Sequence, residues 1–198
     1  MKTFSNTTTL LIFTMLLFLG IVYKINQEHK IPSIDSIPLT SHQPLTLKSF
    51  YGKYTLIYFG FLSCPEVCPT TLKKLAEVEK KIGGDQINIV FMTLDPERDT
   101  IDKMQKYAQF FHPKIIPVRI ENIDQQNAFT RFFGIQYRKI KLGESKLEYT
   151  IDHTTDIILL SPKGKIMDNL HHDSPSSVYV STLQKYLKET SQLPKENL

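Results

Sequence analysis

The sequence predicts an α/β fold in which a central sheet is covered by helices on its faces. Two runs of almost continuous β-branched and aromatic residues, 54–62 (YTLIYFGFL) and 87–94 (INIVFMTL), are typical of strands buried on both faces. Segments with the helical spacing of apolar residues lie between and after these runs. Such an alternation indicates a sheet packed between helices.

The remaining elements are predicted from periodicity and from the residues that break it. Gly83 ends the first helix, Pro113 follows the second, and the turn Pro162-Lys163-Gly164 predicts an antiparallel hairpin around it. In chain order we expect helices over 70–82 and 101–111, a strand over 118–121, a helix over 125–133, paired strands over 156–161 and 165–170, and a closing helix over 174–190.

Length and composition describe one ordinary domain with an appendage. The chain has 198 residues, 41% of them hydrophobic and 22% charged, as in a normal globular protein. Its net charge of +4 is mild, and no basic stripe is interleaved with aromatic residues. Nucleic-acid binding is therefore not expected.

The N-terminal segment predicts a membrane anchor. No charge occurs between Lys2 and Lys24, and the apolar stretch over 7–23 reaches the lower limit of about 17 residues for a spanning helix. A cleaved signal peptide is the alternative, but no small-x-small site follows Gly20, and no cysteine for lipid attachment follows it either. Lys2 favours a cytoplasmic N-terminus. We therefore expect a single-pass protein of the bacterial inner membrane, with its C-terminal domain in the periplasm.

These observations predict four parts. Residues 1–24 form the anchor, 25–41 a polar linker with two prolines, 42–191 the folded domain and 192–198 a tail.

The two cysteines of the chain, Cys64 and Cys68, are candidates for chemistry rather than for stapling the fold. They lie between the first buried strand and the first helix, where backbone N–H groups and the helix dipole lower the pKa of a thiol. Both are therefore predicted to be thiolates near neutral pH. Residues four apart share a face of a helix, and a pair of soft thiolates suits Cu(I). Structural zinc is less favoured, because it normally needs four protein ligands and the chain has no second cysteine pair. A plain disulfide, or two buried thiols that act as small hydrophobic side chains, remains an alternative.

A third ligand would have to come from one of six histidines. His153 stands just before a predicted buried strand, a position in which a histidine is more often structural. His171 and His172 are adjacent at the end of another strand. The residues alone do not choose between them.

Three segments in this order resemble the Sco/SenC family of copper chaperones for cytochrome c oxidase assembly. They are YFGFLSCPEVCPTTL (58–72), LDPERDT (94–100) and the DHT…SPKGKI stretch (152–166). The resemblance covers residue 45 to the C-terminus. The sequence departs from the family pattern at three places: before the first cysteine, over 37–50 and over 120–124. These departures affect the surface that would face a partner.

The resemblance implies a thioredoxin-like fold and copper, as Cu(I) or Cu(II), bound by Cys64, Cys68 and His153. It also implies that Asp95 lies near the metal, and Asp152 is expected to orient the imidazole of its neighbour. The expected activity is delivery of copper to the binuclear site of cytochrome c oxidase subunit II, with no small-molecule substrate and no catalytic turnover.

The alternative is a membrane-tethered thiol-disulfide oxidoreductase, in which Cys64 and Cys68 reduce the cysteines of the oxidase copper site or of other clients. Against it, such enzymes usually have two residues between the cysteines, and this chain has three. The two activities are compatible, because metal loading needs reduced thiols.

Overall fold

The computed structural model describes residues 11–21, 33–83, 85–143 and 145–192, and the chain divides into two compact units, Met1–Pro32 and Ser33–Leu198. In the first unit, residues 11–21 are helical. Within the described parts of the chain, no helix is long and apolar enough to cross a membrane. Both ends of the expected span over 7–23 lie outside the described residues.

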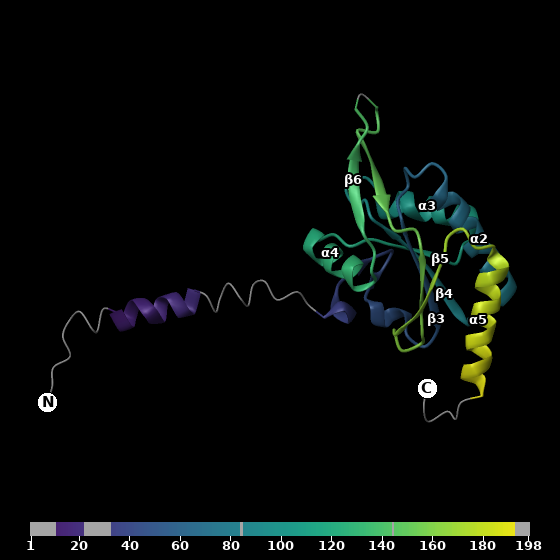
Figure 1. Ribbon diagram of the computed structural model, residues 1–198, viewed down its shortest axis with the longest axis horizontal. Coiled ribbons are helices and arrows are strands. Elements are labelled where there is room, and N and C mark those ends of the chain that lie inside the picture. Colours follow the sequence, from purple (N-terminus) through teal and green to yellow (C-terminus); the bar gives the residue numbers. More distant parts are fainter. Residues whose placement is uncertain (1–10, 22–32, 84, 144, 193–198) are drawn as a thin grey trace. The chain divides into compact units, whose positions relative to one another are not determined.

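The second unit is built on a mixed five-stranded sheet in the order β5-β4-β3-β8-β9 (Figure 1). The three strands β3, β4 and β5 are parallel, whereas β8 pairs antiparallel with β3 and with β9. Their bounds are β3 Tyr54–Gly60, β4 Ile87–Thr93, β5 Ile115–Val118, β8 Ile157–Leu160 and β9 Ile166–Leu170.

Helices cover both faces of this sheet. The helices α2 (Val67–Ile82), α3 (Ile101–Phe111) and α5 (Ser176–Ser191) pack on one face, and α4 (Ile123–Phe132) packs on the other. The second face is completed by two short helices and a small strand pair, which are η1 (Ile34–Ser36), η2 (Leu47–Phe50), β1 (Leu39–Thr40) and β2 (Pro44–Leu45).

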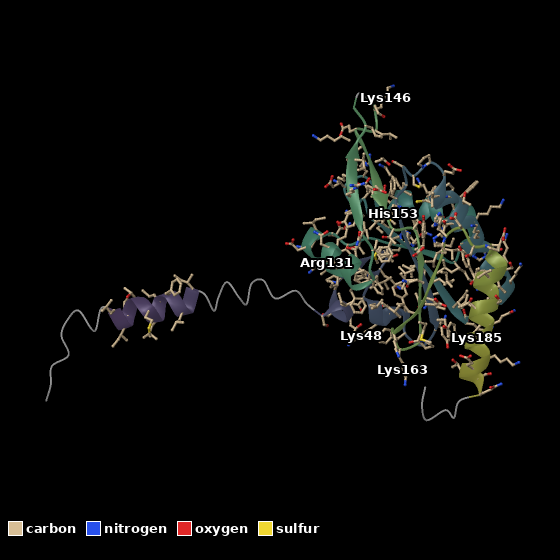
Figure 2. All side chains as sticks on the ribbon, viewed as in Figure 1. Lys48, Arg131, Lys146, His153, Lys163 and Lys185 are labelled. Atoms are coloured by element: carbon tan, nitrogen blue, oxygen red, sulfur yellow. The ribbon has the colours of Figure 1, made fainter. Side chains whose placement is uncertain are left out.

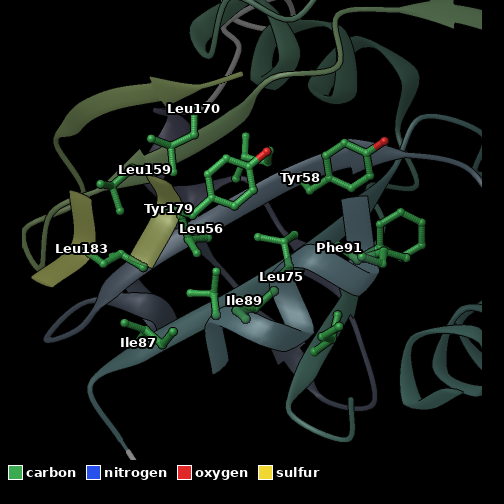
Figure 3. Close-up of a cluster of buried hydrophobic side chains, with 14 of the residues drawn as sticks. Leu56, Tyr58, Leu75, Ile87, Ile89, Phe91, Leu159, Leu170, Tyr179 and Leu183 are labelled. Carbon is green, nitrogen blue, oxygen red and sulfur yellow. The ribbon is translucent and has the colours of Figure 1, made fainter. Parts of the chain in front are cut away.

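The two faces divide the apolar side chains of each central strand by the alternation of a strand. Along β3, Leu56 and Tyr58 enter the core under α2 and α5, whereas Ile57 and Phe59 enter the core under α4. Figure 3 shows the first core, where Leu75 of α2 and side chains of α5 lie against the sheet. The continuous apolar runs in the sequence therefore reflect strands buried on both sides, as predicted.

A second hairpin lies outside the sheet. It consists of β6 (Tyr137–Lys141) and β7 (Tyr149–His153), which pair only with each other among the described strands. The sequence did not predict this hairpin, because β6 reads YRKIK and buries neither face fully.

Most of the other predicted elements are found, with two differences. The strand expected over 118–121 is Ile115–Val118, so it includes Pro117, which an edge strand tolerates. Ile37 and Leu39, expected in the linker, are buried in the core under α4. The folded unit therefore begins nearer to Ser33 than to residue 42.

Candidate metal centre

The two cysteines lie where the chain passes from β3 into α2. The N–H of Cys64 donates to the carbonyl of Phe61 (3.3 Å), and the N–H of Cys68 donates to the sulfur of Cys64 (3.3 Å). Helix α2 begins at Val67, so Cys68 is in its first turn. Both thiols are free; Cys64 is half-buried and Cys68 is fully buried.

The surroundings separate the two thiols electrostatically. The pKa of Cys64 is lowered to about 6, mainly by the hydrogen bond from the Cys68 side chain and also by backbone N–H groups at residues 66–68. The pKa of Cys68 is raised, by that same hydrogen bond and by burial. The prediction of two thiolates was therefore wrong for Cys68: near neutral pH the pair holds one thiolate and one thiol.

Cys68 is enclosed by the end of β3. The hydroxyl of Tyr58 donates to its sulfur at 3.3 Å. Gly60 makes room for it, because a Cβ at this position would lie 2.9 Å from that sulfur. A larger residue at position 60 would therefore displace the thiol.

His153 ends β7, and the carbonyl of the next residue fixes its tautomer. Nδ1 lies 2.7 Å from the carbonyl oxygen of Thr154, which can only accept a hydrogen bond, so the proton is on Nδ1 and the lone pair is on Nε2. Burial lowers the pKa of the imidazole and keeps it neutral at pH 7. A neutral imidazole with a free Nε2 is the form that binds a metal.

His153 is accessible from solution. It lines an open depression of about 450 Å³ together with residues in or next to β6 and β7, which are Gln136, Tyr137, Arg138, Asp152 and Thr154. Figure 2 shows His153 at the base of the β6–β7 hairpin and Lys146 at its tip.

Phe61 connects the cysteines to His153. Its carbonyl accepts from Cys64, and its ring meets the imidazole edge to face, with 5.9 Å between ring centroids. The ligand atoms of Cys64, Cys68 and His153 do not all lie within 4.8 Å of one another; in the described part of the chain, another group of residues meets this limit. A metal bound by all three would therefore have to draw His153 and the cysteine loop together.

The carboxylates expected near the metal have other partners. Asp95 is buried, pairs with Arg98 (2.5 Å) and accepts from the hydroxyl of Tyr149 (2.7 Å). Asp152 pairs with Arg138 at 2.9 Å on the exposed side of the hairpin, and a carbonyl rather than this carboxylate orients His153.

Asp99 is the carboxylate that holds the cysteine loop, and the sequence reasoning missed it. Its Oδ2 accepts from the N–H of Leu62 (3.0 Å) and from the hydroxyl of Thr93 (2.6 Å), and its side chain is buried. The turn at 94–100 contains both Asp95 and Asp99. Their spacing does not show which of them points toward the loop.

The comparisons with known proteins identify the family of the chain. The SCO1/SenC family model matches residues 37–188, which include both cysteines and His153. The chain belongs to the SCO1/SenC family. This SCO1/SenC chain is 36% identical over 125 residues to a SCO2-like protein of Rickettsia felis, covering 62% of the chain and 60% of that relative. It is 31% identical to the mitochondrial SCO2 homologue of Mus musculus, covering 73% of the chain and 58% of that protein.

Solved structures show the same thioredoxin-like, mixed α/β fold. The Arabidopsis thaliana ScoI structure with copper bound is 28% identical with a TM-score of 0.71, covering 79% of this SCO1/SenC chain and 99% of that one. The Bradyrhizobium japonicum ScoI structure with copper bound is 30% identical with a TM-score of 0.68, covering 76% and 96%. The matched part spans about 60% of the length of the first curated relatives.

Proposed function

We propose that this protein is a copper chaperone that binds copper through Cys64, Cys68 and His153 and passes it to an acceptor. The observation that carries the proposal is that Phe61 contacts both candidate ligands: its carbonyl accepts from the N–H of Cys64, a low-pKa thiolate, and its ring meets the imidazole of His153, whose proton on Nδ1 leaves the lone pair on Nε2. Soft thiolates and imidazole suit copper. The copper-bound ScoI structures of two relatives support the choice of metal.

The acceptor we propose is the binuclear copper site of cytochrome c oxidase subunit II. The open depression beside His153 gives a partner's ligands a route to the metal. We further propose that residues 1–24 anchor the chain in the bacterial inner membrane with the domain in the periplasm. An anchor would hold donor and acceptor in one membrane and so raise their effective concentration.

The second candidate function is thiol-disulfide exchange, and one observation favours it. Cys64 is half-exposed and ionised near pH 7, whereas Cys68 is a buried thiol directly beside it. This is the arrangement of an attacking thiolate and a resolving partner. Attack of Cys64 on a client disulfide, followed by attack of Cys68 on the mixed disulfide, would release two reduced client thiols and leave Cys64 and Cys68 as a disulfide. A thiol reductant would then have to reduce this pair before it could bind copper.

Anaerobic Cu(I) titration of the full-length chain against a competing chelator tests the proposal. We expect one equivalent per chain, and a loss of affinity of more than about tenfold in His153→Ala, because the variant lacks a ligand. His42→Ala is the matched control, since His42 is exposed in the turn between β1 and β2.

An unchanged affinity in His153→Ala, combined with rapid reduction of insulin disulfides, would refute the chaperone and favour the oxidoreductase. Slow reduction with a large effect of His153→Ala would support the chaperone.

A further inference from the structure

A second group of side chains that can bind a metal lies at one end of the β8–β9 strand pair. In the antiparallel pair β8–β9, Ile157 lies opposite Leu170. Asp156 immediately precedes β8, and His171 and His172 immediately follow β9. The register therefore brings a carboxylate and two imidazoles from the two ends of one hairpin to the same end of the sheet.

The ligand atoms of these three residues all lie within 4.8 Å of one another. Nε2 of His171 is 4.0 Å from a carboxylate oxygen of Asp156, and the two imidazole rings are 5.0 Å apart between centroids. A fourth donor is adjacent, because a carboxylate oxygen of Asp173 lies 3.1 Å from Nε2 of His172.

The histidine pair is held in place by its neighbours. Nδ1 of His172 contacts the hydroxyl of Thr155 at 2.8 Å, which leaves Nε2 as its ligand atom. The backbone is fixed as well, because the hydroxyl of Tyr179 donates to the carbonyl of His171 (2.7 Å) and Lys74 donates to that of His172. Such support reduces the ordering that metal binding would require.

We propose that Asp156, His171 and His172 form a second metal site, selective for a divalent 3d cation and separate from the cysteine site. Around a metal with bonds of about 2.1 Å, tetrahedral ligand atoms lie about 3.4 Å apart. Ligand atoms that lie within 4.8 Å of one another would therefore have to approach by about 1.4 Å or less. Two imidazoles and a carboxylate without sulfur favour divalent ions over Cu(I), and Cu²⁺ binds such sets most tightly.

The test uses the full-length chain with Cys64→Ser and Cys68→Ser, so that its outcome does not depend on the cysteine site. The probe is Cu²⁺, followed by titration and electron paramagnetic resonance. We expect one equivalent, with magnetic coupling to the nitrogens of two imidazoles. Affinity should fall more than about tenfold in His171→Ala, His172→Ala and Asp156→Asn, because each removes one ligand.

Asp156→Asn keeps the size of the side chain, so a loss in this variant is not explained by misfolding. His42→Ala should leave binding unchanged, and Zn²⁺ should bind the same site more weakly than Cu²⁺. Binding that persists in the His171→Ala, His172→Ala double variant, or coupling to fewer than two imidazoles, overturns the proposal.

Discussion

The proposed copper site has two halves, the cysteine half (Cys64 and Cys68) and the histidine half (His153), and the fold holds them differently. Cys68 belongs to the hydrophobic core under α2, and Cys64 packs against the edges of both cores. His153 belongs to a hairpin outside the main sheet, whose outer surface is polar and exposed. The cysteine half is therefore fixed by close packing, which resists small displacements. The histidine half places one buried side chain, Ile151, in the core under α4, with Tyr137 and Tyr149 packed against that core, and polar contacts add to this attachment.

Those polar contacts are concentrated at one place. Arg98 pairs with Asp95, donates to the carbonyls of Leu147 and Tyr149, and lies 3.7 Å above the ring of Tyr149. The turn at 94–100 thus attaches the hairpin to the end of β4. We expect the histidine half to move more readily than the cysteine half when the metal is bound or released.

Gly60→Ala should have the largest effect on stability, because it adds an atom to the closely packed surroundings of Cys68. The new Cβ would lie 2.9 Å from the sulfur of Cys68 and 3.0 Å from Phe91. Overpacking of this kind costs up to about 3 kcal/mol of unfolding free energy. Urea denaturation should show that loss, and Cu(I) affinity should fall with it.

Gly20→Ala is the matched control, because a Cβ there would meet nothing within 4 Å. Equal stability of the two variants would show that the cysteine half is less tightly packed than the distances indicate.

Tyr149→Phe should have a smaller effect, confined to the other half. It removes the hydroxyl that donates to the buried Asp95 at 2.7 Å, and a hydrogen bond to a charged group contributes about 2 kcal/mol. Hydrogen exchange of the β6–β7 amides should accelerate, while the pKa of Cys64 stays the same. Tyr186→Phe, on α5, removes a hydroxyl elsewhere and should leave that exchange unchanged. Acceleration spread evenly over the domain would contradict the separation into two halves.

Cys68→Ala should have the smallest effect on the fold and a specific effect on Cys64. In the wild type, the rate of alkylation of Cys64 should rise with pH around a midpoint near 6. Without the thiol that donates to Cys64, its pKa should rise toward the ordinary value of a thiol, because the largest cause of the lowering is lost. Cys68→Ser retains a donor and should shift the midpoint less.

The ionisation of Cys64 also gives a sign for stability. Its folded pKa lies below the ordinary value of a thiol, so its contribution to stability is lost as pH falls through about 6. Cys64→Ser should flatten the pH dependence of the free energy of unfolding around pH 6. If Cys68→Ala leaves the alkylation midpoint at 6, the helix N-terminus rather than the second thiol lowers the pKa.

The helices and strands of the layered core were predicted better than the β6–β7 hairpin, for physical reasons. The helix over 101–111 was found at its predicted limits, because Thr100 caps its start and Pro113 follows its end. The β6–β7 hairpin was missed because its strands lie outside the five-stranded sheet and, with only Ile151 buried, lack a regular apolar alternation. Long-range polar contacts, such as that of Asp99 with the amide of Leu62, leave no local pattern to read.

The hydrogen bond that sets the tautomer of His153 uses a main-chain acceptor at Thr154. Every residue carries such a carbonyl, so no substitution at position 154 deletes the acceptor itself. The imidazole orientation is therefore insulated from mutation in a way that an aspartate partner would not allow. The side chain of Thr154 has a separate task, because its hydroxyl accepts from the N–H of Gln136 at 3.1 Å. A substitution there would alter the base of the hairpin while the carbonyl that keeps Nε2 available remains.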